Sequence, residues 1–507
     1  MLSKVQSYGL SGLNGFLVTV EAAVSTGLPE YQTVGLPDAA VKESRERVRT
    51  AIVHSGFPYP IAKIVVNLAP ADQRKEGTLY DLPIALAVLT AAGTVPALPA
   101  GSIVLGELAL DGAVRPVSGV LPMLIDAFKH GYDRFYVPAD NANEAAYIDG
   151  ATVFPVSSLG ELVRALQGRS ILETRPVRHF ESGQSRARFD FAEIKGQTAA
   201  KRAAEVAVAG GHNILLCGTP GSGKTMLARA IPSILPEMTF EEALEVTKIH
   251  SVTGAMKGSL GLITERPFRA PHHGASASAL IGGGSKALPG EISLAHNGVL
   301  FLDELPEFSR DVLESLRQPL EDGEVTVSRA LATATYPARF MLVAAMNPCP
   351  CGNRGSRTKP CTCTPMAIRK YASRISGPLL DRIDLHIEMT EVGYSEITER
   401  RPAESSETIR ARVTAARQRQ AERFKDDGIR TNAEMTGPLL QKYCTPSAES
   451  EAMLKQAFTK LRLSARAYQR VLKVARTIAD LDGSESIKPR HFAEAIQYRS
   501  MELLKNL

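Results

Sequence analysis

The sequence lacks several features that would assign it to a specialised class of protein. Only 6 of its 507 residues are cysteines, which is too few for a disulfide scaffold of this length. The net charge of +5 is small for the size, so it permits nucleic acid as a partner without arguing for one. The opening MLSKVQSYGLSG has neither the apolar core of a signal peptide nor a lipidation pattern, so we expect a cytoplasmic location.

One uncharged run is long enough to span a bilayer. It covers residues 82–106 but is interrupted by prolines and glycines, among them Pro83, Gly93, Pro96 and Pro99. This pattern predicts a buried helix over residues 84–91, followed by a loop and a strand. We therefore expect no membrane partner.

Composition and length indicate a globular protein of several domains. Hydrophobic residues make up 44% and charged residues 22%, which is ordinary for such proteins. Because a single core stops growing near about 250–300 residues, we expect three domains and see no internal repeat. The predicted fold class is α/β, with an α/β domain over residues 1–168, a polar linker over 169–189, a nucleotide domain over 190–392 and a helical part over 393–507.

Local signals mark individual elements of this organisation. The pattern predicts helices over residues 39–54 and 159–166, and a tight hairpin turn at Asp111-Gly112. Farther on, residues 408–425 place apolar side chains on one helical face and five arginines on the rest. Such a charge run is usually a solvated face, although contact with an anionic partner or a neighbouring subunit is the alternative.

Residues 218–225 read GTPGSGKT between an apolar strand-like run and a helix-like segment. This arrangement is typical of a phosphate-binding loop, whose glycines let backbone N–H groups surround phosphate oxygens. Lys224 should reach the β and γ phosphates, and the Thr225 hydroxyl should ligate Mg²⁺. The nucleotide-binding residues predicted in the loop are Gly218, Thr219, Pro220, Gly221, Ser222, Gly223, Lys224 and Thr225. A chance match in a flexible loop is the alternative, which the strand–loop–helix context disfavours.

Polar residues follow two later apolar strands. Asp303 and Glu304 end the run GVLFLDE, and Asn347 ends RFMLVAAMN. Asp303 is predicted to hold Mg²⁺ through water and Glu304 to polarise the attacking water. In a parallel sheet the carboxyl ends of strands face the ligand, so Asn347 should lie beside the γ phosphate. Together these motifs predict ATP hydrolysis, although a helix N-terminus or an ordinary strand-end turn would account for each one alone.

A short segment before the phosphate loop is placed to touch the adenine. It contains Ile194, Gly196 and Gln197, and it precedes a predicted helix. Hydrophobic contact alone would explain Ile194 equally well.

Longer blocks of the sequence resemble a known family. These blocks include FRAPHHGASASALIGGGSKALPGEISLAHNGVLFLDELPEF, FMLVAAMNPCPCG and RISGPLLDRIDLHIE, with VGLPDAAVKESRERVRTAI and VNLAPADQRKEGTLYDLPIALAVL near the N-terminus. They are similar to the magnesium-chelatase-like AAA+ ATPases of the YifB/ComM type, and the similarity extends over nearly the whole chain. It implies an N-terminal domain of Lon-protease-like fold, an AAA+ core and a C-terminal helical lid of magnesium-chelatase type.

The resemblance also implies an assembly and a substrate. Members form a homo-oligomeric ring, expected to be a hexamer, and ComM members drive branch migration of DNA during recombination of incoming DNA. A protein-remodelling or regulatory ATPase is the alternative from another class. A subunit for metal insertion into a tetrapyrrole is a third reading, against which the fused Lon-like domain argues.

Roles for several arginines follow from the resemblance. Arg382 in LLDRID matches the arginine finger that reaches the neighbouring subunit's nucleotide, with Arg374 as a second candidate. Arg466 in LSARAY matches the second sensor on the lid. The hairpin near residues 324–336 resembles an insertion that faces the pore, where Arg329 would touch a phosphate backbone. Surface salt bridges or exposed helix positions are the plain alternatives.

The Lon resemblance does not extend to peptidase chemistry. That catalysis needs a serine in a GPSAG-like context and a later lysine, whereas the matching stretch here is GTLYDLP. We therefore expect the N-terminal domain to serve in assembly or substrate contact.

Two clusters leave alternatives open. Cys349, Cys351, Cys361 and Cys363, within residues 349–363, can close a tetrahedral Zn²⁺ site, or they can be free thiols or redox pairs. His272 and His273 suggest metal binding, but the stretch around them holds no carboxylate, which favours a loop near the nucleotide or the pore.

Overall fold

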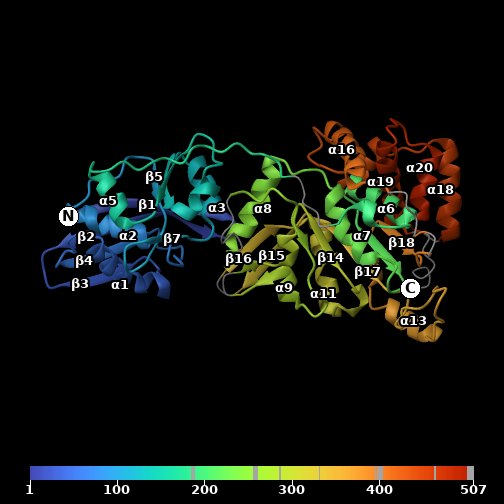
Figure 1. Ribbon diagram of the computed structural model, residues 1–507, viewed down its shortest axis with the longest axis horizontal. Helices are drawn as coiled ribbons and strands as arrows, with labels where there is room; N and C mark the ends of the chain where they lie inside the picture. The colour runs from blue at the N-terminus through green and yellow to red at the C-terminus, as the bar shows by residue number, and fades with distance from the viewer. Residues whose placement is uncertain are drawn as a thin grey trace.

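The computed structural model describes residues 1–183, 189–254, 261–284, 287–329, 332–393, 396, 403–461 and 464–499. These residues form an elongated molecule, with the N-terminal region at one end and the C-terminal helices at the other (Figure 1). The mixed α/β class predicted from the sequence is confirmed. The domain boundaries stay a prediction.

The N-terminal region contains two small sheets covered by helices. The first has the order β1-β2-β4-β3 and the second the order β5-β8-β9, in which all the strands are parallel. The predicted helices over residues 39–54 and 159–166 are confirmed, and β6 and β7 pair across the predicted hairpin turn. The elements are β1 Leu2–Ser11, β2 Asn14–Ser25, β3 Glu30–Val34, α1 Ala39–His54, β4 Lys63–Ala69, α2 Asp81–Ala91, β5 Ser102–Val104, β6 Glu107–Leu108, β7 Val114–Arg115, α3 Val120–Lys129, β8 Arg134–Pro138, α4 Ala142–Ala145, β9 Thr152–Val156 and α5 Leu159–Leu166.

The uncharged run folds into the interior, as predicted. Helix α2 has 10 of its 11 residues buried, because sheet strands and α1 pack around it. A loop and strand β5 follow. Among the described residues, no helix is both long enough and apolar enough to cross a bilayer.

The central region is built on a five-stranded parallel sheet with the order β11-β14-β17-β10-β18. Its inner strands are continuous apolar runs, which is what a sheet covered on both faces requires. The elements are α6 Thr198–Gly210, β10 Ile214–Gly218, α7 Lys224–Ala230, α8 Phe240–Val252, β11 Phe268–Arg269, α9 Ala277–Ile281, α10 Glu291–Leu294, β14 Val299–Leu302, α11 Arg310–Ser315, α12 Arg317–Asp322, β15 Glu324–Arg329, β16 Ala332–Pro337, β17 Met341–Met346, α13 Pro365–Ala372, α14 Gly377–Leu380 and β18 Leu385–Met389.

The C-terminal helices share a hydrophobic core with one face of this sheet. Helix α16 buries Ile409, Val413 and Ala416 against α6, as its spacing predicts, and Phe424 directly after it is also buried. The elements are α16 Ser406–Arg423, α17 Gly437–Tyr443, α18 Ala448–Leu461, α19 Ala465–Leu481 and α20 Pro489–Gln497. Residues of α6, β10, α16 and α19 belong to one cluster, so these helices pack directly on the sheet.

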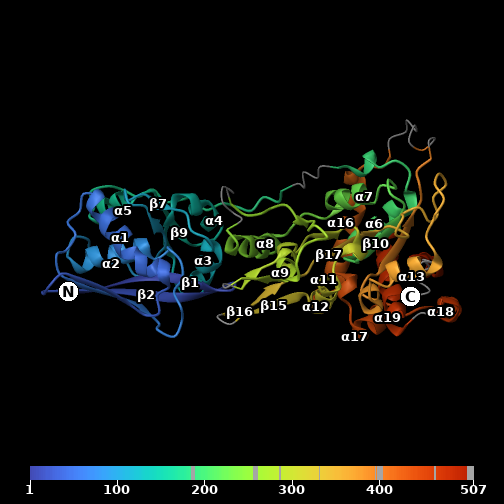
Figure 2. The same ribbon diagram turned by 90° about the horizontal axis from the view of Figure 1, so that it is seen from below.

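The N-terminal and central regions contact each other at several places, two of which involve helix α3 and the turn between β1 and β2. Helix α3 lies beside α8 in both views, and the Ser251 hydroxyl accepts a hydrogen bond from the Gly119 amide at 3.1 Å (Figures 1 and 2). The second contact places the turn between β1 and β2 on the predicted β15–β16 hairpin, where Leu13 packs against the core under it. Arg329 and its predicted phosphate contact lie outside the described side chains.

Candidate nucleotide site

The phosphate loop lies between β10 and α7, as the sequence predicts. Gly221 and Gly223 have φ angles of +81° and +89°, which side chains rarely adopt, so these turns favour glycine. The hydroxyl oxygens of Thr219 and Ser222 are buried and have no hydrogen-bond partner among the described residues. Buried hydroxyls without a partner are uncommon, and both of these lie in the loop that the sequence assigns to phosphate binding.

Lys224 lies at the centre of the loop. Its ammonium donates to the Gly218 and Thr219 carbonyls at 2.7 and 2.9 Å, and to the Asn347 side-chain oxygen at 3.2 Å. Burial lowers the pKa of Lys224, while the charges of Asp303 and Glu304 act in the opposite direction. The two motifs predicted to share the γ phosphate are therefore in contact.

Thr225 and Asp303 also meet. The Thr225 hydroxyl donates to the Asp303 carboxylate at 2.9 Å, although 78 positions separate them in the chain. A hydroxyl and a carboxylate in contact at the mouth of a phosphate loop are a donor set that Mg²⁺ prefers. The residues present therefore fit the cation expected to accompany ATP.

Glu304 begins the turn after β14 in a left-handed conformation with φ of +53°. Such strain is found at functional sites more often than elsewhere. Its carboxylate lies 3.4 Å from Nδ1 of His273, which stacks on His272 with ring centroids 4.1 Å apart. The histidine pair is therefore beside the nucleotide motifs, as predicted, and its carboxylate partner comes from a distant segment.

The predicted adenine segment lies against the phosphate loop. The Gln197 amide donates to the Ser222 carbonyl at 3.0 Å and to the Thr390 carbonyl at 2.6 Å. Gly196 has a positive φ of +59° just before it. Ile194 is only 3% exposed and belongs to the core, which is the plain hydrophobic reading of that residue.

Arg382 and Arg466 line one cavity on the far side of the sheet. A volume of 170 Å³ is bordered by both arginines together with Glu321 and Arg470. Arg382 ion-pairs with Glu321 and donates to the Pro378 carbonyl at 2.9 Å, whereas the Arg466 side chain is exposed.

The strand direction places this cavity far from the chain's own phosphate loop. Arg382 precedes the first residue of β18, whereas the loop follows the last residue of the parallel neighbour β10. Five strand residues span about 16 Å, so the cavity and the phosphate loop lie at opposite ends of the strands.

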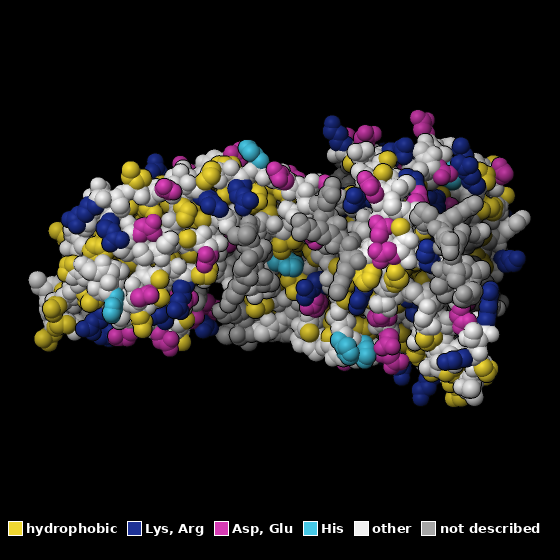
Figure 3. Space-filling view, viewed as in Figure 1, with side chains coloured by type: hydrophobic (Ala, Val, Ile, Leu, Met, Phe, Trp, Pro, Cys, Tyr) yellow, Lys and Arg dark blue, Asp and Glu magenta, His cyan; other side chains and the backbone are white. Residues whose placement is uncertain are grey.

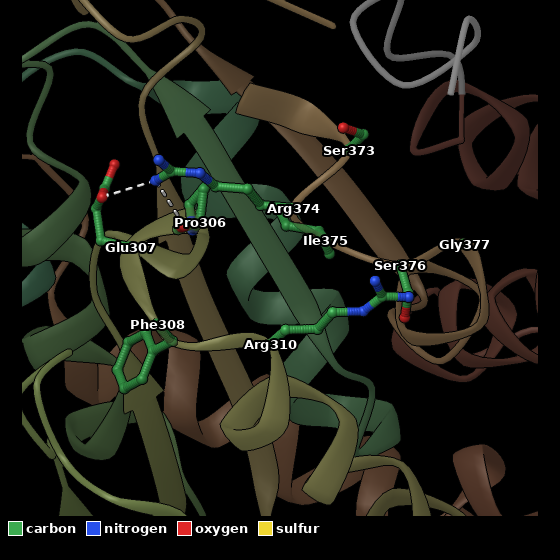
Figure 4. A pocket seen from close by; sticks show the side chains of 9 residues that line it. All are labelled: Pro306, Glu307, Phe308, Arg310, Ser373, Arg374, Ile375, Ser376 and Gly377. Carbon is green, nitrogen blue, oxygen red and sulfur yellow. Dashed lines mark hydrogen bonds and ion pairs between the residues drawn. The ribbon is translucent and has the colours of Figure 1, made fainter. Parts of the chain in front are cut away.

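Arg374, the second candidate, lines a separate open cavity of 660 Å³. It donates to the Glu307 carboxylate at 2.8 Å and to the Pro306 carbonyl at 3.2 Å, while Arg310 borders the same cavity near Ser376 (Figure 4). This cavity adjoins the turn that carries Glu304, so Arg374 has a different setting from Arg382.

The four cysteines predicted as a cluster come together. Their Sγ atoms all lie within 4.8 Å of one another. Backbone N–H groups of Asn353 and Thr362 donate to the Cys351 sulfur and lower the pKa of that thiol to about 6. A group of four sulfurs at this separation can hold a metal ion.

A buried polar network missed by sequence reasoning joins the sheet to the C-terminal helices. Asp384 ion-pairs with Arg470 of α19 and lies 3.5 Å from Nδ1 of the buried His212. His212 also bonds the Thr477 hydroxyl at 2.8 Å. The isolated polar residues before β10 and β18 were a signal, because a buried strand edge rarely carries them unpaired.

The stretch matching the peptidase motif has its polar side chains engaged. Asp81 accepts from Arg47 at 2.7 Å and the Thr78 hydroxyl donates to Glu107, while the ammonium of Lys75, just before the stretch, donates to the Pro70 carbonyl. Burial raises the pKa of Asp81 to about 6 against the opposing effect of Arg47. The expected lack of peptidase activity stays a prediction.

Comparisons with known families cover most of the chain. The family described as magnesium chelatase, subunit ChlI, matches residues 190–397, and its C-terminal part matches residues 403–499. A further family, described as subunit ChlI of Mg-chelatase, matches residues 20–141.

Two relatives are similar along nearly their full length, and a third along a shorter stretch. The protein YifB of Escherichia coli is 45% identical over 506 residues, which cover 99% of this chain and 98% of the relative. The competence protein ComM of Haemophilus influenzae is 44% identical over 516 residues, covering 100% and 99%. The magnesium-chelatase 67 kDa subunit of Chlorobaculum tepidum is 30% identical over 165 residues, or 31% of this chain and 23% of the relative.

The similarity to YifB and ComM extends over the full length of the chain. The parallel sheet also brings the phosphate loop, Asp303 and Asn347 together at the carboxyl ends of its strands. The chain belongs to the magnesium-chelatase-like AAA+ family that includes YifB and ComM.

Proposed function

We propose that the protein hydrolyses ATP to ADP and phosphate at the edge of the sheet formed by the phosphate loop. The observation that carries this proposal is the pair of contacts Lys224–Asn347 and Thr225–Asp303, which join three separate motifs. Lys224 binds the β and γ phosphates, and Asn347 orients the γ phosphate. Thr225 and Asp303 hold Mg²⁺, which when bound neutralises charge that develops on the phosphates.

Glu304 is the group that acts on the attacking water. Its carboxylate is half-exposed and lies beside His273, directly after Asp303 in the chain, and its charge acts on Lys224. It accepts the water proton as the oxygen attacks, and His273 holds the carboxylate in place beforehand.

We infer that a neighbouring subunit completes the site. Arg382 and Arg466 lie at the sheet edge opposite the phosphate loop, so neither reaches its own nucleotide without a rearrangement of the sheet. In a head-to-tail ring, such as the hexamer expected for this family, one subunit's arginine edge meets the next subunit's loop. Arg382 then stabilises the transition-state charge across the interface.

Mixing two inactive variants tests this shared site. Lys224→Ala removes the phosphate contact but keeps Arg382, whereas Arg382→Ala keeps the loop but lacks the arginine. Co-assembled at equal amounts, they should recover roughly a quarter of wild-type turnover, because that fraction of interfaces is complete. Activity of the mixture no greater than the sum of its parts would place Arg382 in its own subunit's site.

We propose that the ring acts on DNA as a helicase or branch-migration motor. Support comes from the family resemblance and from the relative whose name is competence protein ComM. Charge gives no independent support, since Lys, Arg, Asp and Glu side chains are interspersed on the face seen in Figure 3. The candidate contact surface is therefore the β15–β16 hairpin rather than a broad basic patch.

Turnover with and without DNA separates this motor from the alternatives. ATPase rates are measured with single-stranded, duplex and branched DNA over a range of salt concentrations. A DNA motor should be stimulated by one of these forms, and the stimulation should weaken steeply as salt rises. ATPase activity that no DNA changes would favour a protein remodeller or a chelatase-like subunit.

A further inference from the structure

We propose that Cys349, Cys351, Cys361 and Cys363 bind one zinc ion, and that the resulting loop supports the phosphate loop from outside. The zinc assignment stands on the cysteine geometry alone. Its effect on nucleotide binding rests on the proposed ATPase function.

The sulfur separations match a tetrahedral metal centre. Sγ of Cys349 lies 3.4 Å from that of Cys351 and 3.6 Å from that of Cys361, and the latter two are 3.7 Å apart. A tetrahedron with Zn–S bonds of about 2.3 Å has edges of about 3.8 Å. A disulfide needs sulfurs about 2.05 Å apart. The separations therefore fit one shared ion better than redox pairs.

The donor set selects the metal. Within the described part of the chain the donor group consists of four cysteines with no carboxylate or imidazole, and four soft thiolates favour zinc or iron over magnesium or calcium. The chain also directs backbone N–H groups at these sulfurs, from Asn353 and Thr362 to Cys351 and from Arg354 to Cys349. Such bonds disperse the negative charge of a metal tetrathiolate. Four thiolates would fill all four positions of a tetrahedral zinc ion and leave none for water or substrate, so the site is structural rather than catalytic.

The loop that these cysteines close lies on the phosphate loop. Gly352 approaches Pro220 so closely that an added Cβ would lie 2.8 Å from the Pro220 Cγ atom. The first cysteine follows Asn347, which contacts Lys224, by only two positions. On its outer side the loop is tied to the end of β18, because Glu391 accepts from the Ser356 hydroxyl at 2.5 Å and from the Arg357 amide at 3.1 Å.

A metal at this position would therefore act on nucleotide binding through packing. It would hold the chain after Asn347 in one conformation and keep Gly352 against Pro220. Without the metal, nothing would crosslink the two ends of the loop, because the six cysteines form no disulfide among the described residues. Lys224 would then keep its own contacts while the phosphate loop lost its outer support.

Metal content of the full-length protein tests the site. Wild type purified without chelators should contain about one zinc per chain by mass spectrometry. Cys361→Ser/Cys363→Ser should lose at least 90% of it, whereas Cys444→Ser, which removes a buried thiol of the C-terminal helices, should retain it. The assignment would be overturned if wild type supplied with zinc contained less than one tenth of an equivalent of zinc. It would also be overturned if the protein contained iron instead of zinc.

A second measurement covers variants that fail to fold. Native wild type is treated with a mercurial reagent, and zinc release is followed with a chromophoric chelator. Zinc release should track modification of the accessible cluster thiols Cys351, Cys361 and Cys363, and the buried Cys349 should react as the metal leaves. Cys217 and Cys444, which are buried outside the cluster, should react only after denaturation. Rapid reaction of all four cluster thiols with no release of zinc would contradict the proposal.

The coupling to nucleotide has its own readout. Binding of a fluorescent ATP analogue should weaken about tenfold in Cys361→Ser/Cys363→Ser and stay unchanged in Cys444→Ser. Equal nucleotide affinity in zinc-free and zinc-bound protein would refute the coupling and leave the metal site standing. Zinc at one equivalent in a protein that neither binds nor hydrolyses ATP would refute the ATPase proposal instead.

Discussion

The carboxyl ends and the amino ends of the strands in the five-stranded sheet form two edges with complementary chemistry. The carboxyl ends of the strands bring together two contacting pairs, Lys224 with Asn347 and Thr225 with Asp303. The opposite edge gathers arginines, of which Arg382 and Arg470 are paired with carboxylates of their own chain. The carboxyl ends of the strands thus carry groups that can bind a polyanion such as a nucleotide. In the part of the chain that the structure describes, the opposite ends carry arginines but no phosphate loop.

This difference explains why a single chain is an incomplete enzyme. Parallel strands deliver all their carboxyl ends to one edge, so residues that follow strands collect there and residues that precede strands collect opposite. Arg382 cannot join Lys224 by any side-chain rotation, because about 16 Å of strand separates the two edges. Assembly is the simplest way to bring both edges to one nucleotide.

The largest effect should come from the carboxyl edge. Glu304→Gln keeps the shape of the side chain but cannot accept a proton, so kcat should fall about 10³-fold while ATP binding changes little. Steady-state turnover and equilibrium binding of labelled ATP are the measurements. Glu307→Gln is the matched control, since Glu307 pairs with Arg374 in the neighbouring cavity. A similar loss in the control would move the general base away from Glu304.

The opposite edge should produce the next largest effect. Arg382→Ala should lower kcat about 10³-fold, the low end for an arginine finger, only under conditions where rings form. Arg466→Ala should cost about tenfold, because Arg466 lines the same cavity but its side chain is exposed. Turnover measured across a protein dilution series checks both. If Arg374→Ala loses more activity than Arg382→Ala, the roles of these two arginines are reversed.

The carboxyl edge could be predicted from sequence because each motif there follows a strand with a clear apolar signal. Thr225 and Asp303 were assigned to one cation from motif chemistry alone, and the structure brings them into contact. The two CxC pairs, with one residue between the cysteines of each, likewise indicated a cluster, and the four sulfurs converge.

The opposite edge was harder because its partners are set by tertiary packing. Nothing near Arg382 in the chain identifies Glu321, which lies 61 positions away on α12. Asp384 and Arg470 are joined only because α19 packs against the start of β18. Likewise, the carboxylate beside His273 belongs to Glu304, so a search of the neighbouring sequence could not find it.

Breaking the network at the arginine edge should affect stability more than turnover. Arg470→Ala leaves Asp384 buried without its cation, which should lower the free energy of unfolding by about 3 kcal/mol at pH 7. Urea unfolding followed by circular dichroism is the measurement, since the chain has no tryptophan. Arg490→Ala, which breaks an exposed pair with Asp482, should cost less than about 1 kcal/mol.

The pH dependence of that loss has a definite sign. Burial alone would raise the pKa of Asp384, but the charge of Arg470 and the bond from His212 hold it well below its ordinary value. The pair therefore stabilises the fold above the unfolded-state pKa of 3.8, and this contribution is lost as the pH falls. The difference between wild type and Arg470→Ala should accordingly be larger at pH 5 than at pH 3. A difference that grows on acidification would exclude Asp384 as the group concerned.

The smallest effect should come from Gln197, at the margin of the carboxyl edge. Its amide joins the Ser222 carbonyl to the Thr390 carbonyl, so it ties the phosphate loop to the end of β18. Asn tolerates the left-handed backbone of this position but is one methylene shorter. Gln197→Asn should therefore raise KM for ATP about fivefold, equivalent to one lost hydrogen bond, with kcat within about twofold. Gln197→Ala should add the backbone cost and raise KM further. A fall in kcat at constant KM in either variant would mean that Gln197 acts on catalysis rather than on the position of the loop.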